Sequence, residues 1–409
     1  MPTGLAQMSF GFPKKHNYSL SHWLQSVHGD ALLDHRTTPE LPQSVDIVII
    51  GSGITGTLIA KNIVATWPEK KVIVLEARQF CSGATGRNTG HCKPDQWRGF
   101  KRYEGLFGTE QALKILQNEQ QTWSDLVRYI RENEVDSAAN ANDIFESYKA
   151  AGGKVDNIKV TKDPMEAAKI SGIKDAQACY AWSASTLHPW KLVAHIMRDN
   201  LRRGVNLQTN TLVTKITKSL RNDYRWIVQS ERGQIECATV VYATNAYSSA
   251  LEPSLRGLIV PTPHMCNKVI PPKTIQDRQG LENSYGVLLP KGDLFSINPR
   301  RNEGYPVLFG GSNPGQHELE KWLTENPDRC TDDGLLGFRS VTEAVQEFAE
   351  GQFKDWTYDP PDRTEAYKEA WSGIMGLSLD GVPFVGEVPG LASQWICAAY
   401  HGQYVKKAS

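Results

Sequence analysis

Two short runs of β-branched residues form the clearest pattern in the first part of the chain. Residues 45–50 read Val-Asp-Ile-Val-Ile-Ile, and residues 71–76 read Lys-Val-Ile-Val-Leu-Glu. Runs of this kind are typical of strands buried on both faces of a parallel sheet. Between them, a glycine turn leads into a helical pattern from Thr55 to about Thr66, which ends before Pro68. We therefore predict a βαβ unit, which is right-handed in nearly all known proteins.

Beyond this unit, helical and strand-like segments follow one another. Helical spacing of apolar residues predicts a helix over 109–133. Asp163-Pro164 is expected to begin a second helix, with Glu166 completing a capping box, and a third runs from Pro189 to Gly204. Strands are expected over 206–217, 224–230, 234–238, 240–244, 285–289 and 307–309, with a hairpin turn at 231–233.

Composition indicates a folded globular chain without a global charge. Hydrophobic residues make up 40% of it and charged residues 22%, and the 45 basic residues balance the 45 acidic ones. Because no net field attracts polyanions or anionic lipids, we expect neither a nucleic-acid nor a membrane partner. The chain start lacks the pattern of a secretory signal, and residues 45–50 are too few to span a bilayer. We therefore expect a cytoplasmic location.

The seven cysteines are scattered, odd in number and without a CxxC spacing. This pattern favours free thiols in a reducing compartment over a disulfide framework or a zinc site, so we expect no metal.

A glycine-rich loop separates the first predicted strand from its helix. It reads Gly51-Ser52-Gly53-Ile54-Thr55-Gly56. In a GxGxxG loop the first glycine allows a tight turn, the second a close approach to a pyrophosphate and the third close packing of helix on strand. Glu76, twenty positions beyond Gly56, ends the second strand and can accept hydrogen bonds from ribose hydroxyls. The loop predicts a dinucleotide, but it does not distinguish FAD from NAD.

The next segment distinguishes the two cofactors. Residues 81–91 read Cys-Ser-Gly-Ala-Thr-Gly-Arg-Asn-Thr-Gly-His. This segment resembles the one after the second strand in the D-amino-acid oxidase superfamily, the FAD-dependent group that includes glycine, sarcosine and γ-glutamylputrescine oxidases. The form ATGRN-x-GH is most similar to the fungal FAD-dependent oxidoreductase branch. A plain glycine-rich loop is the alternative. The resemblance implies that FAD runs past Ala77, Ala84, Thr85, Gly86, Arg87, Asn88, Gly90 and His91.

Four more segments are similar to the family, in the family's order. Residues 211–215 place Val213 against the adenine, and residues 243–246 place Thr244 near the pyrophosphate. Residues 371–376 read Trp-Ser-Gly-Ile-Met-Gly, and residues 380–386 read Asp-Gly-Val-Pro-Phe-Val-Gly. Together they resemble a flavin-domain signature, which implies that Gly373 contacts the cofactor. Finally, His401 and Gly402 resemble a loop at the pyrimidine side of the flavin.

The resemblance also implies the fold. We expect an α/β protein in which a Rossmann-like, parallel FAD-binding sheet is intertwined with a substrate domain built on an antiparallel or mixed sheet. Because 409 residues exceed the roughly 250–300 that one core supports, two domains are expected in any case. The expected division is an N-terminal arm over 1–43, an FAD-binding domain over 44–100, 185–260 and 366–409, and a substrate domain over 101–184 and 261–365.

In two places the chain departs from the family. The family continues after Gly402 with another glycine and a closing helix, whereas here residues 403–409 follow and the chain stops. Residues 137–141 are also too few for the strands that the family carries over the flavin. A truncated chain with exposed apolar surface and weak FAD binding is therefore one hypothesis.

The resemblance implies oxidation of the C–N bond of an amine or amino acid to an imine, with hydride transfer to flavin N5 and reoxidation by O2 to give H2O2. His91 and Lys93 are the candidate catalytic residues, since both follow the flavin segment, and packing or surface positions are the alternative. Arg300 and Arg301 could bind a substrate carboxylate, although their loop-like surroundings favour a solvated position.

Other functions remain open. The histidine that carries a covalent flavin in dimethylglycine-type relatives falls near Arg87, so nothing supports covalent attachment. A flavin dehydrogenase or tailoring enzyme of specialised metabolism and a non-catalytic remnant are the alternatives. An NAD dehydrogenase is disfavoured because nothing after Glu76 resembles a nicotinamide site. Substrate and oligomeric state are not readable from the sequence.

Overall fold

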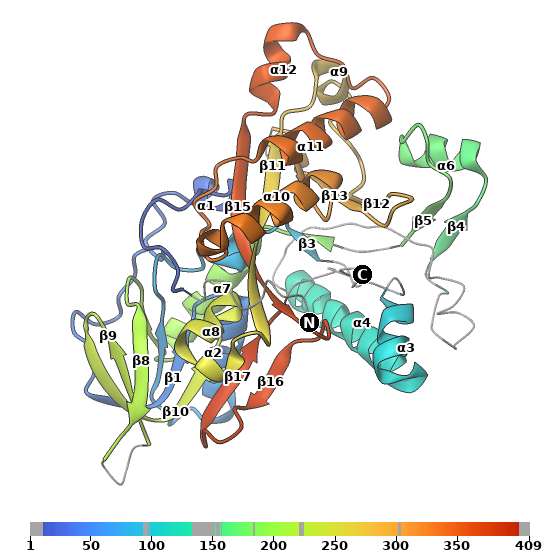
Figure 1. The fold of residues 1–409 in the computed structure, drawn as a ribbon. Coiled ribbons are helices and arrows are strands. Elements are labelled where there is room, and N and C mark those ends of the chain that lie inside the picture. The colour runs from blue at the N-terminus through green and yellow to red at the C-terminus, as the bar shows by residue number, and fades with distance from the viewer. Residues whose placement is uncertain are drawn as a thin grey trace.

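Two β-sheets organise the protein (Figure 1). The computed structural model describes residues 11–92, 99–132, 158–182, 185–220, 225–301 and 304–400, with single positions at 97, 152 and 156. Within these ranges an eight-stranded, mostly parallel sheet and a five-stranded antiparallel sheet lie one above the other in the view of Figure 1. The expected α/β class, with a parallel sheet joined to a second, antiparallel one, is confirmed.

The larger sheet has a core of five parallel strands in the order β17-β10-β1-β2-β7. Antiparallel β16 lies beside β17, and the hairpin partner β9 pairs with the first half of β10 and with β8. The bounds are β1 Ser44–Ile50, β2 Val72–Leu75, β7 Asn206–Gln208, β8 Val213–Lys218, β9 Trp226–Ser230, β10 Gly233–Tyr242, β16 Phe384–Glu387 and β17 Gln394–Ala398.

The predicted βαβ unit is present as β1, α2 (Ile54–Thr66) and β2. Ile50, the last residue of β1, is paired with Leu75 of β2 and with Tyr242 of β10. These three strands therefore end at the same level. Helix α7 (Pro189–Arg202) packs against α2, where the Asn200 side chain donates a hydrogen bond to the Thr57 carbonyl at 2.9 Å.

Three strand predictions in this sheet were wrong in their bounds. Residues 234–238 and 240–244 belong to one strand, β10, because β1 pairs along nearly all of it while β9 and β17 each pair with a part. Residues 206–217 are two strands, β7 and β8, separated by a turn in which Asn210 has φ of 49°. The predicted hairpin at 231–233 is confirmed by the pairing of Ser230 with Gly233.

The five-stranded sheet has the order β12-β13-β14-β11-β15. Its strands are β11 Ile259–Val269, β12 Tyr285–Leu288, β13 Leu294–Pro299, β14 Val307–Gly310 and β15 Glu369–Ser378. Helices α10 (Pro314–Glu325) and α11 (Arg339–Gln352) lie beside this sheet (Figure 1), and Phe295 stacks on Phe348 of α11 at 4.2 Å. Strand β15 belongs to this sheet, because it pairs with β11 along ten residues. The division that puts residues 366–409 in the FAD-binding domain stays a prediction.

The remaining elements flank the two sheets. Asp163 caps α6 (Pro164–Ser171) by accepting from the Glu166 N–H at 2.8 Å, as predicted, but the Glu166 carboxylate lies against Lys169. The other elements are α1 His22–Ser26, α3 Phe100–Phe107, α4 Thr109–Glu132, α8 Ser248–Leu251, α9 Lys273–Gln276, α12 Pro360–Ala366, and the strand pairs β3 (His91–Cys92) with β6 (Ser185–Thr186) and β4 (Lys159–Thr161) with β5 (Cys179–Ala181). All seven cysteines fall in the described ranges, and each is a free thiol.

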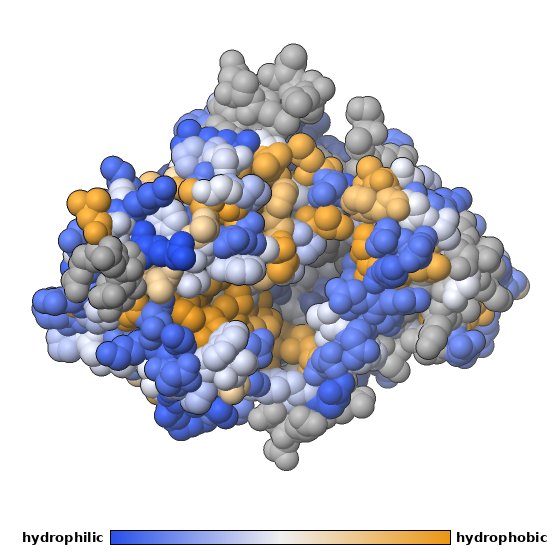
Figure 2. Space-filling view, turned by 90° about the horizontal axis from the view of Figure 1, so that it is seen from below, coloured by the Kyte–Doolittle hydropathy of each residue, from blue (hydrophilic) through white to orange (hydrophobic). Residues whose placement is uncertain are grey.

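The lower face of the molecule is hollowed in its middle, and hydrophobic residues gather around the hollow (Figure 2). Among the exposed large hydrophobic side chains, Val385 of β16 and Trp395 of β17 are 67% and 46% accessible to solvent. No helix in the described part of the chain is both long enough and apolar enough to cross a membrane.

Replacing Trp190 by Phe tests the packing of α7 on the parallel sheet. Trp190 is 1% exposed, and its indole N–H donates to the Phe80 carbonyl at 3.0 Å. Losing this donor and leaving a small void should lower the free energy of unfolding by about 2 kcal/mol in urea denaturation. Trp67→Phe is the matched control, because Trp67 is 52% exposed and its loss should change stability by less than about 0.5 kcal/mol. Equal effects of the two substitutions would contradict this account of the core.

Candidate cofactor and active site

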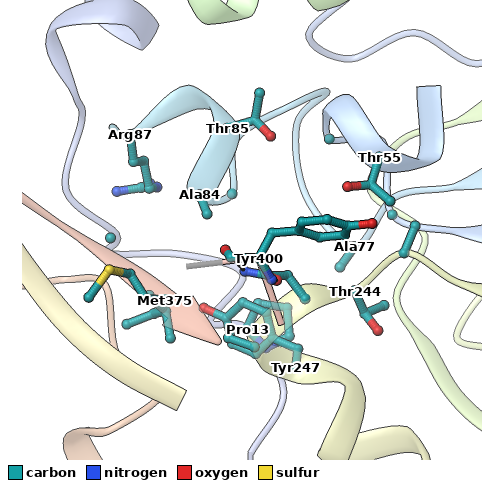
Figure 3. A pocket seen from close by; sticks show the side chains of 18 of the residues that line it. Pro13, Thr55, Ala77, Ala84, Thr85, Arg87, Thr244, Tyr247, Met375 and Tyr400 are labelled. Carbon is teal, nitrogen blue, oxygen red and sulfur yellow. Dashed lines mark hydrogen bonds between the residues drawn. The ribbon is translucent and has the colours of Figure 1, made fainter. Parts of the chain in front are cut away.

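A cavity of about 440 Å³ lies at the carboxyl ends of β1, β2 and β10 and reaches the second sheet. One end is formed by the glycine loop, Glu76 and Val213, and the other by His264 and Cys266 of β11 with Gly373 of β15. Figure 3 shows Thr55 and Ala77 on one side of this space, Arg87 and Met375 on the other, and Tyr400 between them. Ligands of open parallel sheets bind at the carboxyl ends of the strands, so this cavity is the candidate site.

The glycine loop fits its place only because Gly51 and Gly56 carry no side chain. Gly51 has φ of 108°, and a Cβ there would lie 2.5 Å from the Ala243 carbonyl oxygen of the neighbouring strand end. A Cβ on Gly56 would lie 1.9 Å from the Gly51 carbonyl oxygen. Gly53 is the N-cap of α2 and has no side chain that could cap this helix. The first turn of α2 therefore offers backbone N–H groups to an anion in the cavity.

Glu76 is a carboxylate held in a fixed place at the end of β2. It accepts hydrogen bonds from the backbone N–H of Ser52 at 3.0 Å, the hydroxyl of Ser52 at 2.7 Å and the N–H of Arg78 at 3.1 Å. The Glu76 carbonyl also accepts from the Thr211 N–H at 2.7 Å, which brings the start of β8 and its buried Val213 to this end of the cavity. This arrangement is suited to a ribose and an adjoining flat base.

The segment after β2 forms a second wall. Its short 3₁₀ turn, Ala84–Gly86, places Thr85 so that its hydroxyl accepts from the Ile54 N–H at 3.1 Å. Arg87 follows, but its guanidinium turns into the protein, where it donates to the Ser82 carbonyl at 2.7 Å and the Ser372 carbonyl at 2.8 Å. Arg87 therefore fixes this wall to β15, and only part of the residue faces the cavity.

The groups at the far end of the cavity are uncharged at neutral pH. Burial lowers the pKa of His264 to about 4 and raises the pKa of the Cys266 thiol to about 12. The Cys266 thiol lies 3.8 Å from the Arg87 carbonyl, to which it can donate. His91 also lines the cavity, at the start of β3, whose partner is β6. His264 and Cys266 can therefore accept or donate hydrogen bonds without presenting a full charge.

Most residues that the sequence singled out for the cofactor meet at this cavity. Those that line it are Gly51, Gly53, Ile54, Thr55, Glu76, Ala77, Ala84, Thr85, Arg87, Asn88, His91, Val213, Thr244 and Gly373. Ser52, Gly56, Gly86 and Gly90 lie behind the wall, where they allow close packing or hold Glu76. Lys93, His401 and Gly402 lie outside the described residues. Contact of any of these residues with a cofactor stays a prediction.

The arginine hypothesis for a substrate carboxylate finds no place at this cavity. Arg300 lies over the Trp23 ring at 4.9 Å, and Arg301 donates to the Gln279 carbonyl at 3.0 Å. Neither is among the residues that line the cavity.

Sequence reasoning missed several lining residues. Met375 and Tyr400 stand inside segments that were singled out, so they could have been included. His264 and Cys266 carried no signal, because prolines 261 and 263 hide the strand in which they lie. Phe12 and Pro13 were assigned to a peripheral arm, yet both line the cavity.

The glycine loop, the first turn of α2 and the Glu76 carboxylate fit a dinucleotide. Comparisons with known proteins indicate which dinucleotide it is. The family model of FAD-dependent oxidoreductases called DAO matches residues 46–408. A curated relative, the probable oxidoreductase OrdL of Rhizobium meliloti, is 22% identical over 392 residues, which cover 87% of this chain and 81% of the relative.

Solved structures of low sequence identity share the fold. Glycine oxidase from Geobacillus kaustophilus superposes with a TM-score of 0.61 at 18% identity, covering 88% of this chain and 90% of its own. L-Amino acid deaminase from Proteus myxofaciens, in complex with anthranilate, superposes with a TM-score of 0.63 at 17% identity, covering 93% and 90%. Because the family model matches most of its length, this chain belongs to the DAO family of FAD-dependent oxidoreductases.

Proposed function

We propose that this FAD-dependent oxidoreductase oxidises the C–N bond of an amine or an amino acid. The observation that supports the proposal most directly is the single cavity that joins the glycine loop of one sheet to the uncharged groups of the other. A dinucleotide anchored at the loop would reach β11 and β15, where a substrate could meet its reactive end. The solved relatives named as glycine oxidase and L-amino acid deaminase act on substrates of this class.

In this proposal FAD lies along the cavity with its adenosine half beside Glu76 and Val213 and its diphosphate at the first turn of α2. The N–H groups of that turn favour negative charge. Gly373 lets β15 pack closely on Arg87, since a Cβ there would lie 3.1 Å from the Arg87 Cβ. When bound, FAD would supply the redox chemistry, as acceptor of a hydride from the carbon next to nitrogen, with O2 as the final electron acceptor and H2O2 as product.

At the reacting end, the protein itself would position the substrate and would surround its amine with uncharged side chains. Among the described residues, neutral His264 and the protonated Cys266 thiol offer an ammonium ion no negative charge, which favours binding of the substrate amine as the free base. His91 lines the same cavity and stays our candidate catalytic residue. The imine that leaves would hydrolyse in water to a carbonyl compound and a free amine or ammonia.

Peroxide release from a panel of amines and amino acids, measured on the purified FAD-loaded protein, tests the activity. Substrate-dependent H2O2 with one equivalent of O2 consumed supports an oxidase. Reduction of an artificial dye acceptor without peroxide supports the dehydrogenase alternative. A protein that binds FAD but oxidises no member of the panel by either readout would count against a C–N oxidising function.

Replacing Gly53 by Val tests the placement of FAD. Gly53 lines the cavity with φ of −64°, so a side chain is tolerated by the backbone but would fill the space beside Thr85, 3.0 Å from a Cβ. We expect FAD affinity to fall by about 100-fold or more, with the far-UV circular dichroism unchanged. Gly337→Val is the matched control, because a Cβ there has nothing within 4 Å, and it should keep the yellow colour. Full flavin absorbance in Gly53→Val would exclude this placement.

The partly buried His264 should make stability depend on pH. Its pKa is about 4 in the folded chain and 6.5 ordinarily, so the folded state binds fewer protons than the unfolded state between these values. The free energy of unfolding should therefore fall as the pH drops from 6.5 to 4, by up to about 3 kcal/mol from this residue. We expect His264→Gln to remove that part of the slope in urea titrations, while His28→Gln, on the surface, leaves it intact. Identical slopes for both variants would show that His264 is protonated as readily as a free histidine.

A further inference from the structure

The N-terminal arm reaches into the candidate cofactor cavity. Phe12 and Pro13 line it, and Figure 3 shows Pro13 next to Tyr247 at the edge of the space. The arm then passes over the segment after β2 and the start of β15 before it enters α1. It is therefore a third wall of the cavity, in addition to the two sheets.

Beneath the arm lies a buried cluster of two arginines and one aspartate. Arg78 holds Asp333 through two hydrogen bonds of 2.9 Å, and the Nε of Arg87 lies 3.3 Å from the same carboxylate. The side chains are 3% exposed or less. Removing one partner of such a cluster leaves a buried charge without compensation, which is strongly unfavourable. The cluster thus fixes the wall that carries Arg78 and Arg87 to the loop that carries Asp333.

Ser19 of the arm completes this cluster. Its backbone N–H and its hydroxyl both donate to the Asp333 carbonyl, at 2.8 and 2.7 Å. The same hydroxyl accepts from Arg87 Nη1 and from the Ser372 N–H, each at 3.1 Å. Ser19 is fully buried, so no water can replace these contacts while the arm is docked. One hydroxyl therefore ties both cavity walls, through Arg87 and through the residue before Gly373, to the arm.

Tyr18 covers the two guanidinium groups. Its ring centre lies 4.6 Å from the Arg78 Cζ and 5.3 Å from the Arg87 Cζ, which is cation–π distance. Further along, Arg78 donates to the Lys14 carbonyl at 3.3 Å, and the Lys14 ammonium pairs with Asp332 at 2.7 Å. These contacts place Phe12 and Pro13 against the cavity.

We propose that the arm is a working part of the cofactor site: Phe12 and Pro13 contact bound FAD, and Tyr18 and Ser19 are positioning residues that keep the arm and both walls in place. The inference rests on the proposed placement of FAD in this cavity. Since FAD binds only the docked arrangement, FAD binding and arm docking stabilise each other, and the coupling is equal in both directions.

Limited trypsin digestion of the full chain, with and without FAD, measures the coupling. Cleavage after Lys14 or Lys15 requires the arm to leave its contacts, because the Lys14 carbonyl is bonded to Arg78 and Lys15 pairs with Glu231. We expect FAD to slow this cleavage by about tenfold or more. Cleavage after Lys291, in the exposed turn between β12 and β13, is the internal control and should not change. Equal cleavage of the arm with and without FAD would overturn the proposal.

Variants of the arm give the second readout, the FAD dissociation constant from titration of the apoprotein. Ser19→Ala should raise it by about tenfold and abolish the protection of Lys14 by FAD. Tyr18→Ala should weaken binding as well, whereas Tyr18→Phe keeps the ring and should bind nearly as the unaltered protein does. Leu20→Ala is the matched control, because Leu20 is 48% exposed between two buried serines.

The outcomes separate this proposal from the placement of FAD. If Gly53→Val loses FAD but Ser19→Ala and Tyr18→Ala bind it as tightly as the unaltered protein, the arm proposal fails and the placement stands. If Gly53→Val retains FAD, the placement fails and the arm proposal fails with it.

Discussion

The close approach of Gly51 to the carbonyl of Ala243 is the contact on which the rest of the site depends. It exists because β1, β2 and β10 end at one level, so that the turn after one strand meets the end of its neighbour. Any side chain at Gly51 would push these strand ends apart and would turn the first turn of α2 away from the cavity. Glu76, Thr244 and the first turn of α2 all line the cavity around this one backbone contact.

The local part of this arrangement was predictable from the sequence. The β-branched runs, the glycine spacing and the acidic residue after β2 each depend only on residues close together in the sequence. The strands β1 and β2 and the helix α2 that they predicted are present in the structure. Pairing over long distances was not predictable in the same way. The sequence does not show that β10 is one strand that pairs with three partners. It also does not show that β15 pairs with β11 in the antiparallel sheet.

Strand β11 shows why part of the site was hidden. Prolines 261 and 263 lie in it, and proline cannot donate to a ladder, so the segment did not read as a strand. The structure accommodates them because β14 pairs only with Asn267–Val269, which leaves the first part of β11 as an edge on that side. His264 and Cys266 therefore face the cavity from a strand that no periodicity revealed. Arg87 shows the opposite case: its place in a motif was visible, whereas the inward turn of its guanidinium depends on Asp333, far away in the sequence.

The long-range pairing of β10 with β17 has a consequence for how the chain is made. β17 extends the parallel sheet from Gln394 onward, and β15 closes the second sheet only at Ser378. On a ribosome that adds about 5–20 residues per second, β10 must therefore wait on the order of ten seconds or more for β17 to emerge. During that interval one edge of β10 stays unpaired in the nascent polypeptide, which makes chaperone assistance and growth temperature strong determinants of soluble yield.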